Sequence, residues 1–192
     1  MPGTDIDTLI NAFEKSFPAA ERKDFNLIED AYNFAQKAHR GQKRMSGEPC
    51  FSHSFETAYQ LANWGMDSQT VAAGLLHDVA EDTSVSLEEI KKEFGEEIAF
   101  LVDGITKLGH LKYRTSEEKQ AENIRKMLLS ISRDLRVVII KLADRLHNMK
   151  TLDALPPAPQ KRISLETSEI YAPLAYRLGM QSLAGELEDL AF

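Results

Sequence analysis

Four ionisable side chains are concentrated within residues 75–83, a stretch that is otherwise apolar. These side chains are His77, Asp78, Glu81 and Asp82. If the stretch is a mostly buried helix, His77 and Glu81 share one face, because residues four apart lie one turn above each other. Buried charges need compensation, and a bound metal ion often provides it. A polar, solvated helix end is the alternative, but the adjacent His and Asp after two leucines favour the metal.

A second predicted helix is apolar on one side and polar on the other. Its apolar face, at about 100° per residue, consists of Leu135, Ile139, Leu142 and Leu146. Its polar face consists of Lys141, Asp144, Asn148 and Thr151. This helix therefore offers a carboxylate, an amide and a hydroxyl on one side.

His53, near the start of a further predicted helix, completes the set of candidate metal ligands. Together with His77, Asp78 and Asp144 it gives two imidazoles and two carboxylates. This mixture suits a divalent transition ion such as Mn²⁺, Fe²⁺ or Zn²⁺ with open positions for water and substrate. Glu81, one turn after His77, is then placed to accept a proton from the activated water.

Apolar residues recur at helical spacing through most of the chain, which predicts an all-α, multi-helix domain. The predicted helices cover residues 6–17, 27–38, 55–62, 68–83, 87–94, 98–105, 115–131, 135–151 and 163–178. Residues 136–140 have the β-branched content of a strand, but the helical spacing continues to Met149 and favours a helix. Asp67 or Ser68 and a Ser86–Glu89 capping box are predicted helix starts. Residues 156–159 are expected to form a loop between helices.

Length and composition predict one cytoplasmic domain. The chain has 192 residues, which form a single domain with residues 1–24 as an N-terminal helix. Its net charge of −7 argues against a nucleic-acid partner. Cys50 is the only cysteine, so an intrachain disulfide is impossible and a reducing compartment fits. Neither a signal peptide nor an apolar run long enough to span a membrane is expected.

Several specific motifs extend from about residue 25 to the end of the chain. They are GQ at 41–42, RMSGEP at 44–49, His53, HDVAEDT at 77–83, VDGITKL at 102–108, AENIRKM at 121–127, KLADRLHNMKTL at 141–152 and EIYAPLAYRLG at 169–179. The pattern His…His-Asp…Asp resembles the HD phosphohydrolase superfamily. The surrounding motifs are similar to the hydrolase domain of the RelA/SpoT alarmone enzymes.

This resemblance implies hydrolysis of the 3′-pyrophosphate of (p)ppGpp, a guanine alarmone of the stringent response, to GDP or GTP plus pyrophosphate. It implies one Mn²⁺ per active site, held by His53, His77, Asp78 and Asp144. It also implies that Glu81 and Asp82 orient and activate the attacking water. By the same resemblance, Arg44 packs on the guanine face. The matching positions that line the nucleoside pocket are Ser46, Asn148 and Thr151.

Three departures from the family pattern keep alternatives open. Met45 stands where the family often has lysine, Cys50 replaces a common tyrosine and Ser54 a common proline. None removes a predicted ligand, but Met45 and Cys50 lie near the base. A related HD phosphohydrolase acting on adenine alarmones or NADPH is therefore a second hypothesis. A third is a binding or regulatory module without chemistry.

Two further expectations concern the cations and the remaining histidines. The candidate cations for binding an anionic substrate are Lys107, Lys112, Arg125, Lys126 and Lys141. Most of them fit equally well on an ordinary solvent-exposed helix face. The other histidines, interpreted as structural or solvated, are His39, His110 and His147.

The last expectation concerns the end of the chain. Long RelA/SpoT proteins continue past the segment that resembles residues 185–192 into a synthetase domain. A stand-alone hydrolase and a fragment both remain possible. The match of the last helix to the long members favours a fragment.

Overall fold

The computed structural model describes residues 4–109 and 134–192. Within these ranges every regular element is helical, apart from one isolated bridge between Lys43 and Pro49, so the all-α prediction is confirmed. The helices are α1 (Ile6–Ser16), α2 (Arg22–Ala38), α3 (Cys50–Asn63), α4 (Ser68–Leu76), α5 (Val79–Asp82), α6 (Leu87–Phe94), α7 (Glu96–Gly109), α9 (Leu135–Lys150), α10 (Pro157–Glu166), α11 (Ala172–Arg177) and α12 (Gln181–Ala191). A 3₁₀ turn, Leu152–Ala154, and a π-helical turn, Thr167–Tyr171, complete the list.

Helix starts and ends follow the local sequence signals. The Asp67 carboxylate accepts the backbone N–H of Thr70 at 2.7 Å and caps α4. Ser86 and Glu89 form the predicted capping box at the start of α6. Gly95 ends α6 with a φ of 90°, a conformation that favours glycine. These three predictions are confirmed.

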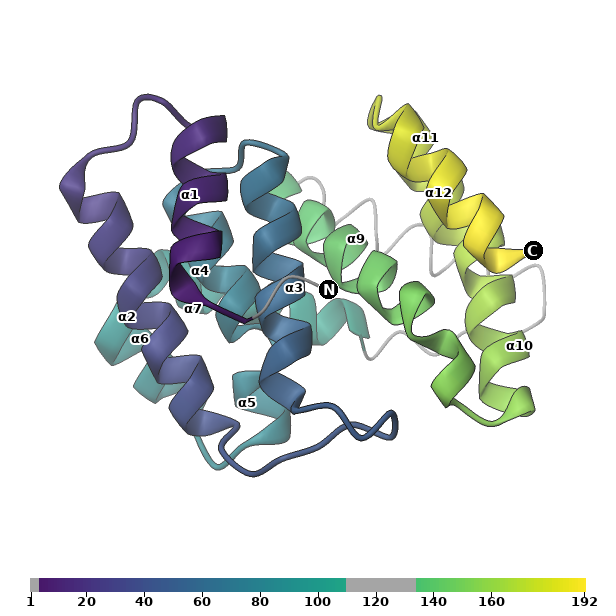
Figure 1. Ribbon diagram of the computed structural model, residues 1–192, viewed down its shortest axis with the longest axis horizontal. Helices are drawn as coiled ribbons and strands as arrows, with labels where there is room; N and C mark the ends of the chain where they lie inside the picture. Colours follow the sequence, from purple (N-terminus) through teal and green to yellow (C-terminus); the bar gives the residue numbers. More distant parts are fainter. Residues whose placement is uncertain (1–3, 110–133) are drawn as a thin grey trace.

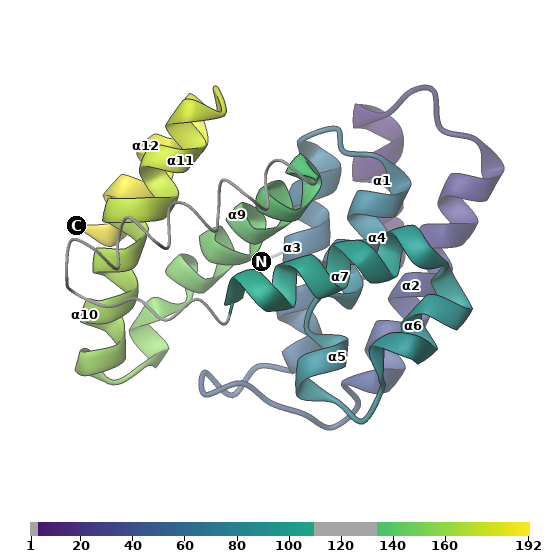
Figure 2. The same ribbon diagram turned by 180° about the vertical axis from the view of Figure 1, so that it is seen from behind.

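Helix α4 occupies the centre of the molecule and fixes the relative positions of its neighbours. It packs against α2, α3, α7 and α9, and all of its residues except Gln69 are buried. Figures 1 and 2 show α1–α7 gathered on one side of α9, with α10–α12 on the other side. The end of α4, the start of α3 and the middle of α9 therefore meet within the core.

The predicted continuous helix over residues 68–83 is wrong. Helix α4 ends at Leu76, and the short helix α5 begins at Val79, so His77 and Asp78 lie in the turn between them. The His77 ring bonds the carbonyl of Gly74 at 2.7 Å, an acceptor that a continuing helix would use. In this turn the His77 side chain is buried, whereas that of Asp78 is about one-third exposed (32%).

Two smaller expectations also fail. Residues 157–159 are not a loop, because α10 begins at Pro157; proline suits the first turn, where its missing N–H would have no partner. Leu135, predicted on the apolar face, is 42% exposed at the first position of α9. The predicted helix over residues 115–131, the cations Lys112, Arg125 and Lys126, and His110 lie outside the described residues. No helix in the described ranges is long and apolar enough to cross a bilayer.

Gly74 permits the close packing of α3 on α4. A Cβ at this position would lie 2.5 Å from Leu61 Cδ1, and Leu61 is fully buried. We expect Gly74→Ala to lower the free energy of unfolding by about 1–3 kcal/mol, because overpacking forces neighbouring side chains to shift. Gly185→Ala in α12 is the matched control, since its Cβ meets open space. Denaturant unfolding of both variants measures the difference, and equal stability of the two would contradict this account.

Candidate metal centre and adjoining pocket

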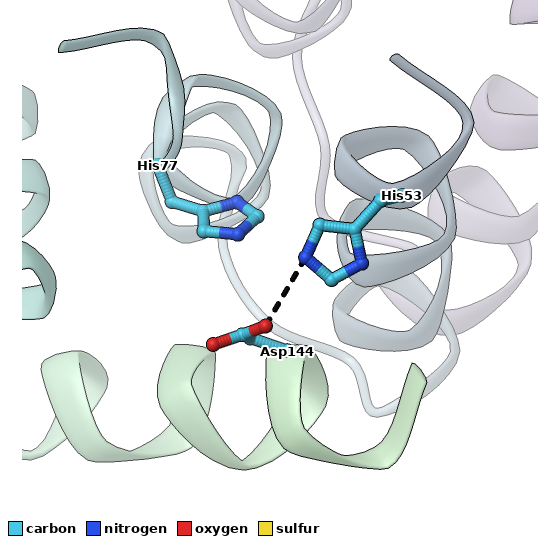
Figure 3. Close-up of side chains that lie close together, drawn as sticks. All are labelled: His53, His77 and Asp144. Atoms are coloured by element: carbon cyan, nitrogen blue, oxygen red, sulfur yellow. Dashed lines mark ion pairs between the residues drawn. The ribbon is translucent and has the colours of Figure 1, made fainter. Parts of the chain in front are cut away.

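Three of the predicted ligands form a compact buried group. His53, His77 and Asp144 each offer one ligand atom, and these atoms lie within 4.8 Å of one another. The three residues are 4%, 1% and 4% exposed, respectively. Figure 3 shows the side chains pointing toward one another from three separate segments: α3, the end of α4 and the middle of α9.

Asp78, the fourth predicted ligand, contacts both imidazoles of the group. Its Oδ1 lies 3.2 Å from His77 Nε2, and its Oδ2 lies 3.5 Å from His53 Nε2. His53 Nε2 also lies 3.1 Å from Asp144 Oδ1. The structure thus brings all four predicted ligands together, with Asp78 as the more exposed member.

The hydrogen bonds of the two imidazoles fit a divalent cation. His77 Nδ1 bonds the Gly74 carbonyl, and its buried Nε2 faces Asp78 Oδ1 at 3.2 Å without the alignment of a hydrogen bond. His53 likewise turns Nε2 toward the carboxylates and Nδ1 toward His147. Two buried imidazole nitrogens that face carboxylate oxygens are suited to a metal ion that binds through their lone pairs.

Charges within the group keep both carboxylates ionised. Burial opposes the charge of Asp144, yet Lys141 and His53 hold its pKa well below the usual range. Burial also opposes the charge of His77, but Asp78 and Asp144 overcome it and raise the pKa of His77 to about 9. For His53 burial dominates and lowers the pKa. Two ionised buried carboxylates attract a cation strongly.

Arg44 connects the loop before α3 to α9. The loop folds back on itself through the Lys43–Pro49 bridge, and the Arg44 N–H donates to the Glu48 carbonyl at 2.9 Å. The guanidinium then donates to Asn148 Oδ1 at 2.6 Å. These contacts hold the planar cation of Arg44 beside the metal group.

A cavity of about 690 Å³ adjoins the metal group. The predicted site residues that line it are Arg44, Ser46, Asp82, Asn148 and Thr151. Other cations in its wall are Lys43, Lys141, Arg145 and Arg162. Glu81 is exposed and is not among the lining residues, whereas Met45 and Cys50 are. The cavity combines a cationic wall with the size of a nucleotide-type ligand.

Comparison with known proteins places the chain in a family. A family model described as HD domain matches residues 31–181. The chain belongs to the HD domain family. Its RelA/SpoT resemblance is also confirmed: it is 53% identical over 158 residues to a Haemophilus influenzae protein named guanosine-3′,5′-bis(diphosphate) 3′-pyrophosphohydrolase, covering 82% of this chain and 23% of that protein.

Other relatives of this HD domain are named as a bifunctional synthase and hydrolase or as a pyrophosphokinase. The Escherichia coli bifunctional (p)ppGpp synthase/hydrolase SpoT is 48% identical over 86% of this chain and 24% of its own length. A Streptomyces coelicolor GTP pyrophosphokinase is 47% identical over 187 residues, which are 97% of this chain and 22% of that protein. The chain thus spans about a quarter or less of these relatives. A solved structure, a metazoan ortholog of SpoT described as hydrolysing ppGpp, aligns with a TM-score of 0.57 and 25% identity over 86% of this chain and 85% of that one.

Sequence reasoning missed several residues of the HD domain that surround the site. His147 is buried and bonds both His53 and Arg44, so a solvated position is wrong for it, as it is for the buried His39. Its position three residues after Asp144, on the same face of α9, is the signal that identifies it. Arg145 and Arg162 were not among the predicted cations; Lys107, which was, is exposed and paired with Asp103.

Proposed function

We propose that this HD domain hydrolyses the 3′-pyrophosphate of (p)ppGpp in a Mn²⁺-dependent reaction, giving GDP or GTP plus pyrophosphate. The observation that carries the proposal is the buried group of His53, His77, Asp78 and Asp144 beside a cation-lined cavity. The names of the relatives and of the structural neighbour support the substrate.

The four proposed ligands would hold Mn²⁺ through two imidazole nitrogens and the carboxylate oxygens. A mixed nitrogen and oxygen set suits Mn²⁺, Fe²⁺ or Zn²⁺, and the resemblance to the RelA/SpoT hydrolase domain supports Mn²⁺ among these. When bound, the ion supplies Lewis-acid stabilisation of phosphoryl charge and a more acidic water. Lys141 pairs with Asp144 and keeps that carboxylate ionised and in position.

Glu81 and Asp82 are the proposed catalytic residues. Both lie on the single-turn helix α5 directly after His77 and Asp78. Asp82 lines the cavity, and burial together with the charge of Asp78 raises the pKa of its carboxyl group. A carboxylate with a raised pKa is a better acceptor for a proton from attacking water. Glu81 is exposed and free to turn toward substrate on the same helix.

The cavity wall divides into a proposed base side and a proposed phosphate side. Arg44 presents a planar cation suited to packing on a purine face. Ser46, Asn148 and Thr151 also line the cavity, where they would offer polar contacts to the nucleoside. Lys141 and Arg162 add positive charge that a highly anionic substrate requires.

The decisive experiment is hydrolysis of ppGpp by protein stripped of metal and then reloaded. We expect Mn²⁺ to restore release of pyrophosphate, with GDP as the second product, and EDTA to abolish it again. Product chromatography together with a pyrophosphate assay measures both. Metal-loaded protein that leaves ppGpp intact while hydrolysing another nucleotide would disprove the assignment.

Met45 and Cys50 support a second candidate, an HD phosphohydrolase of adenine alarmones or NADPH. Both line the cavity, and Met45 is 72% exposed there, so this part of the wall is less polar than the family pattern suggests. Catalytic efficiencies for guanine alarmones, adenine alarmones and NADPH separate the candidates. A clear guanine preference rejects this second one.

We further propose that residues 1–192 act as one hydrolase unit, with residues 1–24 as an N-terminal segment that contains α1, in a longer cytoplasmic protein with a synthetase domain. The small share of the relatives that the chain spans supports this, as does the bifunctional name of the Escherichia coli relative. The single cysteine fits a reducing compartment. The full reading frame tests the proposal directly.

A further inference from the structure

His147 connects the two halves of the site through one ring nitrogen. Its Nδ1 lies 2.7 Å from Nδ1 of His53 and 3.2 Å from a guanidinium nitrogen of Arg44. The residue is buried, and its Nε2 has no partner within the described ranges. Both contacts of the ring therefore go through Nδ1.

The geometry assigns the protons of these two rings. His53 Nε2 faces Asp144 Oδ1 and Asp78 Oδ2, so it is the nitrogen that a metal would use, and in the metal-bound protein it carries no proton. Nδ1 of His53 then carries the proton and donates to His147 Nδ1. Arg44 has only donors, which requires the same nitrogen of His147 to be an acceptor. The single lone pair of His147 Nδ1 is thus shared between the two donors, with His53 the nearer, and the proton of His147 resides on Nε2.

Asn148 makes a parallel connection on the next position of α9. Its Oδ1 accepts from Arg44 at 2.6 Å, and its Nδ2 donates to Asp144 Oδ1. Arg44 is therefore linked to one proposed ligand, Asp144, through Asn148 and to another, His53, through His147. The contact between His53 and Asp144 closes a five-residue ring.

We propose that His147 is a positioning residue that orients the metal ligand His53 and the nucleotide-contacting Arg44 together, so that metal binding and nucleotide binding strengthen each other. The metal part stands on the geometry of His53; the nucleotide part rests on the proposed function of Arg44. Partners that orient a ligating imidazole typically change metal affinity by 10–100-fold. Linkage requires any coupling between the two ligands to be reciprocal.

A matched pair of substitutions isolates the acceptor nitrogen. In His147→Asn the side-chain Oδ1 stands close to the position of Nδ1, whereas His147→Leu has nearly the shape of asparagine without an acceptor. We expect His147→Leu to weaken binding of Mn²⁺ alone by about 10–100-fold, measured from free Mn²⁺ by electron paramagnetic resonance. His147→Asn should retain most of the affinity. Equal Mn²⁺ affinity in wild type and leucine variant, or equal losses in both variants, overturns the proposal.

The coupling is measured with GDP as the nucleotide probe. Wild-type protein should bind GDP more tightly with saturating Mn²⁺ than without metal, and His147→Leu should lose this difference while His147→Asn retains it. A GDP affinity that gains equally from Mn²⁺ in all three proteins rejects the coupling. These arms need no hydrolysis, so failure of ppGpp turnover with intact coupling rejects the proposed function alone.

A measurement on the wild-type protein tests the proposal even if His147→Leu does not fold. Long-range ¹⁵N–¹H spectra of the wild-type protein loaded with diamagnetic Zn²⁺ report the imidazole tautomers. The expected result is a proton on Nδ1 of His53 and on Nε2 of His147. The opposite tautomer at His147 overturns the proposal, because Nδ1 would then donate and could not accept from Arg44.

Discussion

Asp144→Asn is expected to lower ppGpp hydrolysis by about 10³-fold or more and to weaken Mn²⁺ binding by more than about 100-fold. Asp144 is buried at the centre of the proposed metal site, where it contacts His53 and pairs with Lys141. Asparagine keeps the shape of the side chain but removes the charge that attracts the ion. Isothermal titration with Mn²⁺ and a pyrophosphate-release assay measure the two losses.

Asp189→Asn in α12 is the control for this substitution, because it makes the same chemical change on an exposed carboxylate. It should leave both Mn²⁺ binding and hydrolysis at the wild-type level. Circular dichroism verifies that Asp144→Asn remains helical. A folded Asp144→Asn protein with wild-type activity and wild-type Mn²⁺ affinity would reject the metal assignment.

Glu81→Gln and Asp82→Asn are expected to lower kcat for ppGpp by about 10²–10⁴-fold, the usual contribution of a general acid–base group. Both substitutions remove a proton acceptor next to the metal group and leave the four proposed ligands in place. Mn²⁺ affinity should therefore stay close to wild type, in contrast to Asp144→Asn. Single-turnover hydrolysis with saturating ppGpp measures the chemical step.

The two carboxylates are distinguished by comparing their variants under the same conditions. Glu88→Gln on α6 is the control, because Glu88 is also exposed and lies outside the cavity wall. If kcat is unchanged in Glu81→Gln and Asp82→Asn, neither carboxylate acts on the water. If Mn²⁺ affinity falls as much as kcat, their role is to support the metal site rather than to move a proton.

Helical spacing was sufficient to predict most of the fold. Apolar periodicity predicted a helix over residues 136–140, and α9 confirms it. The Ser86–Glu89 capping box predicted the start of α6. Such signals lie within a few residues of one another. The grouping of His53, His77 and Asp144 depends on packing among three elements. The residue types on the predicted helices suggested it, and the motif resemblance made the prediction specific.

The turn at His77 and the role of His147 required the three-dimensional structure. Leu75, Val79 and their neighbours continue a helical pattern, and nothing in it marks the place where the His77 ring takes the Gly74 carbonyl. His147 depends on His53 and Arg44, which are more than 90 residues earlier in the chain. No local pattern encodes a contact over that separation.

The placement of Asp144 and Asn148 on one helix has a consequence for the lengths of ligands. Four residues of α-helix span about 6 Å, and a helix resists stretching. The distance along α9 between Asp144 and Asn148 is therefore fixed, whereas Arg44 and Ser46 lie on the loop before α3. Among ligands of similar charge, the domain should therefore prefer those in which the distance from the nucleoside group at Asn148 to the phosphate at the proposed metal site matches this fixed length.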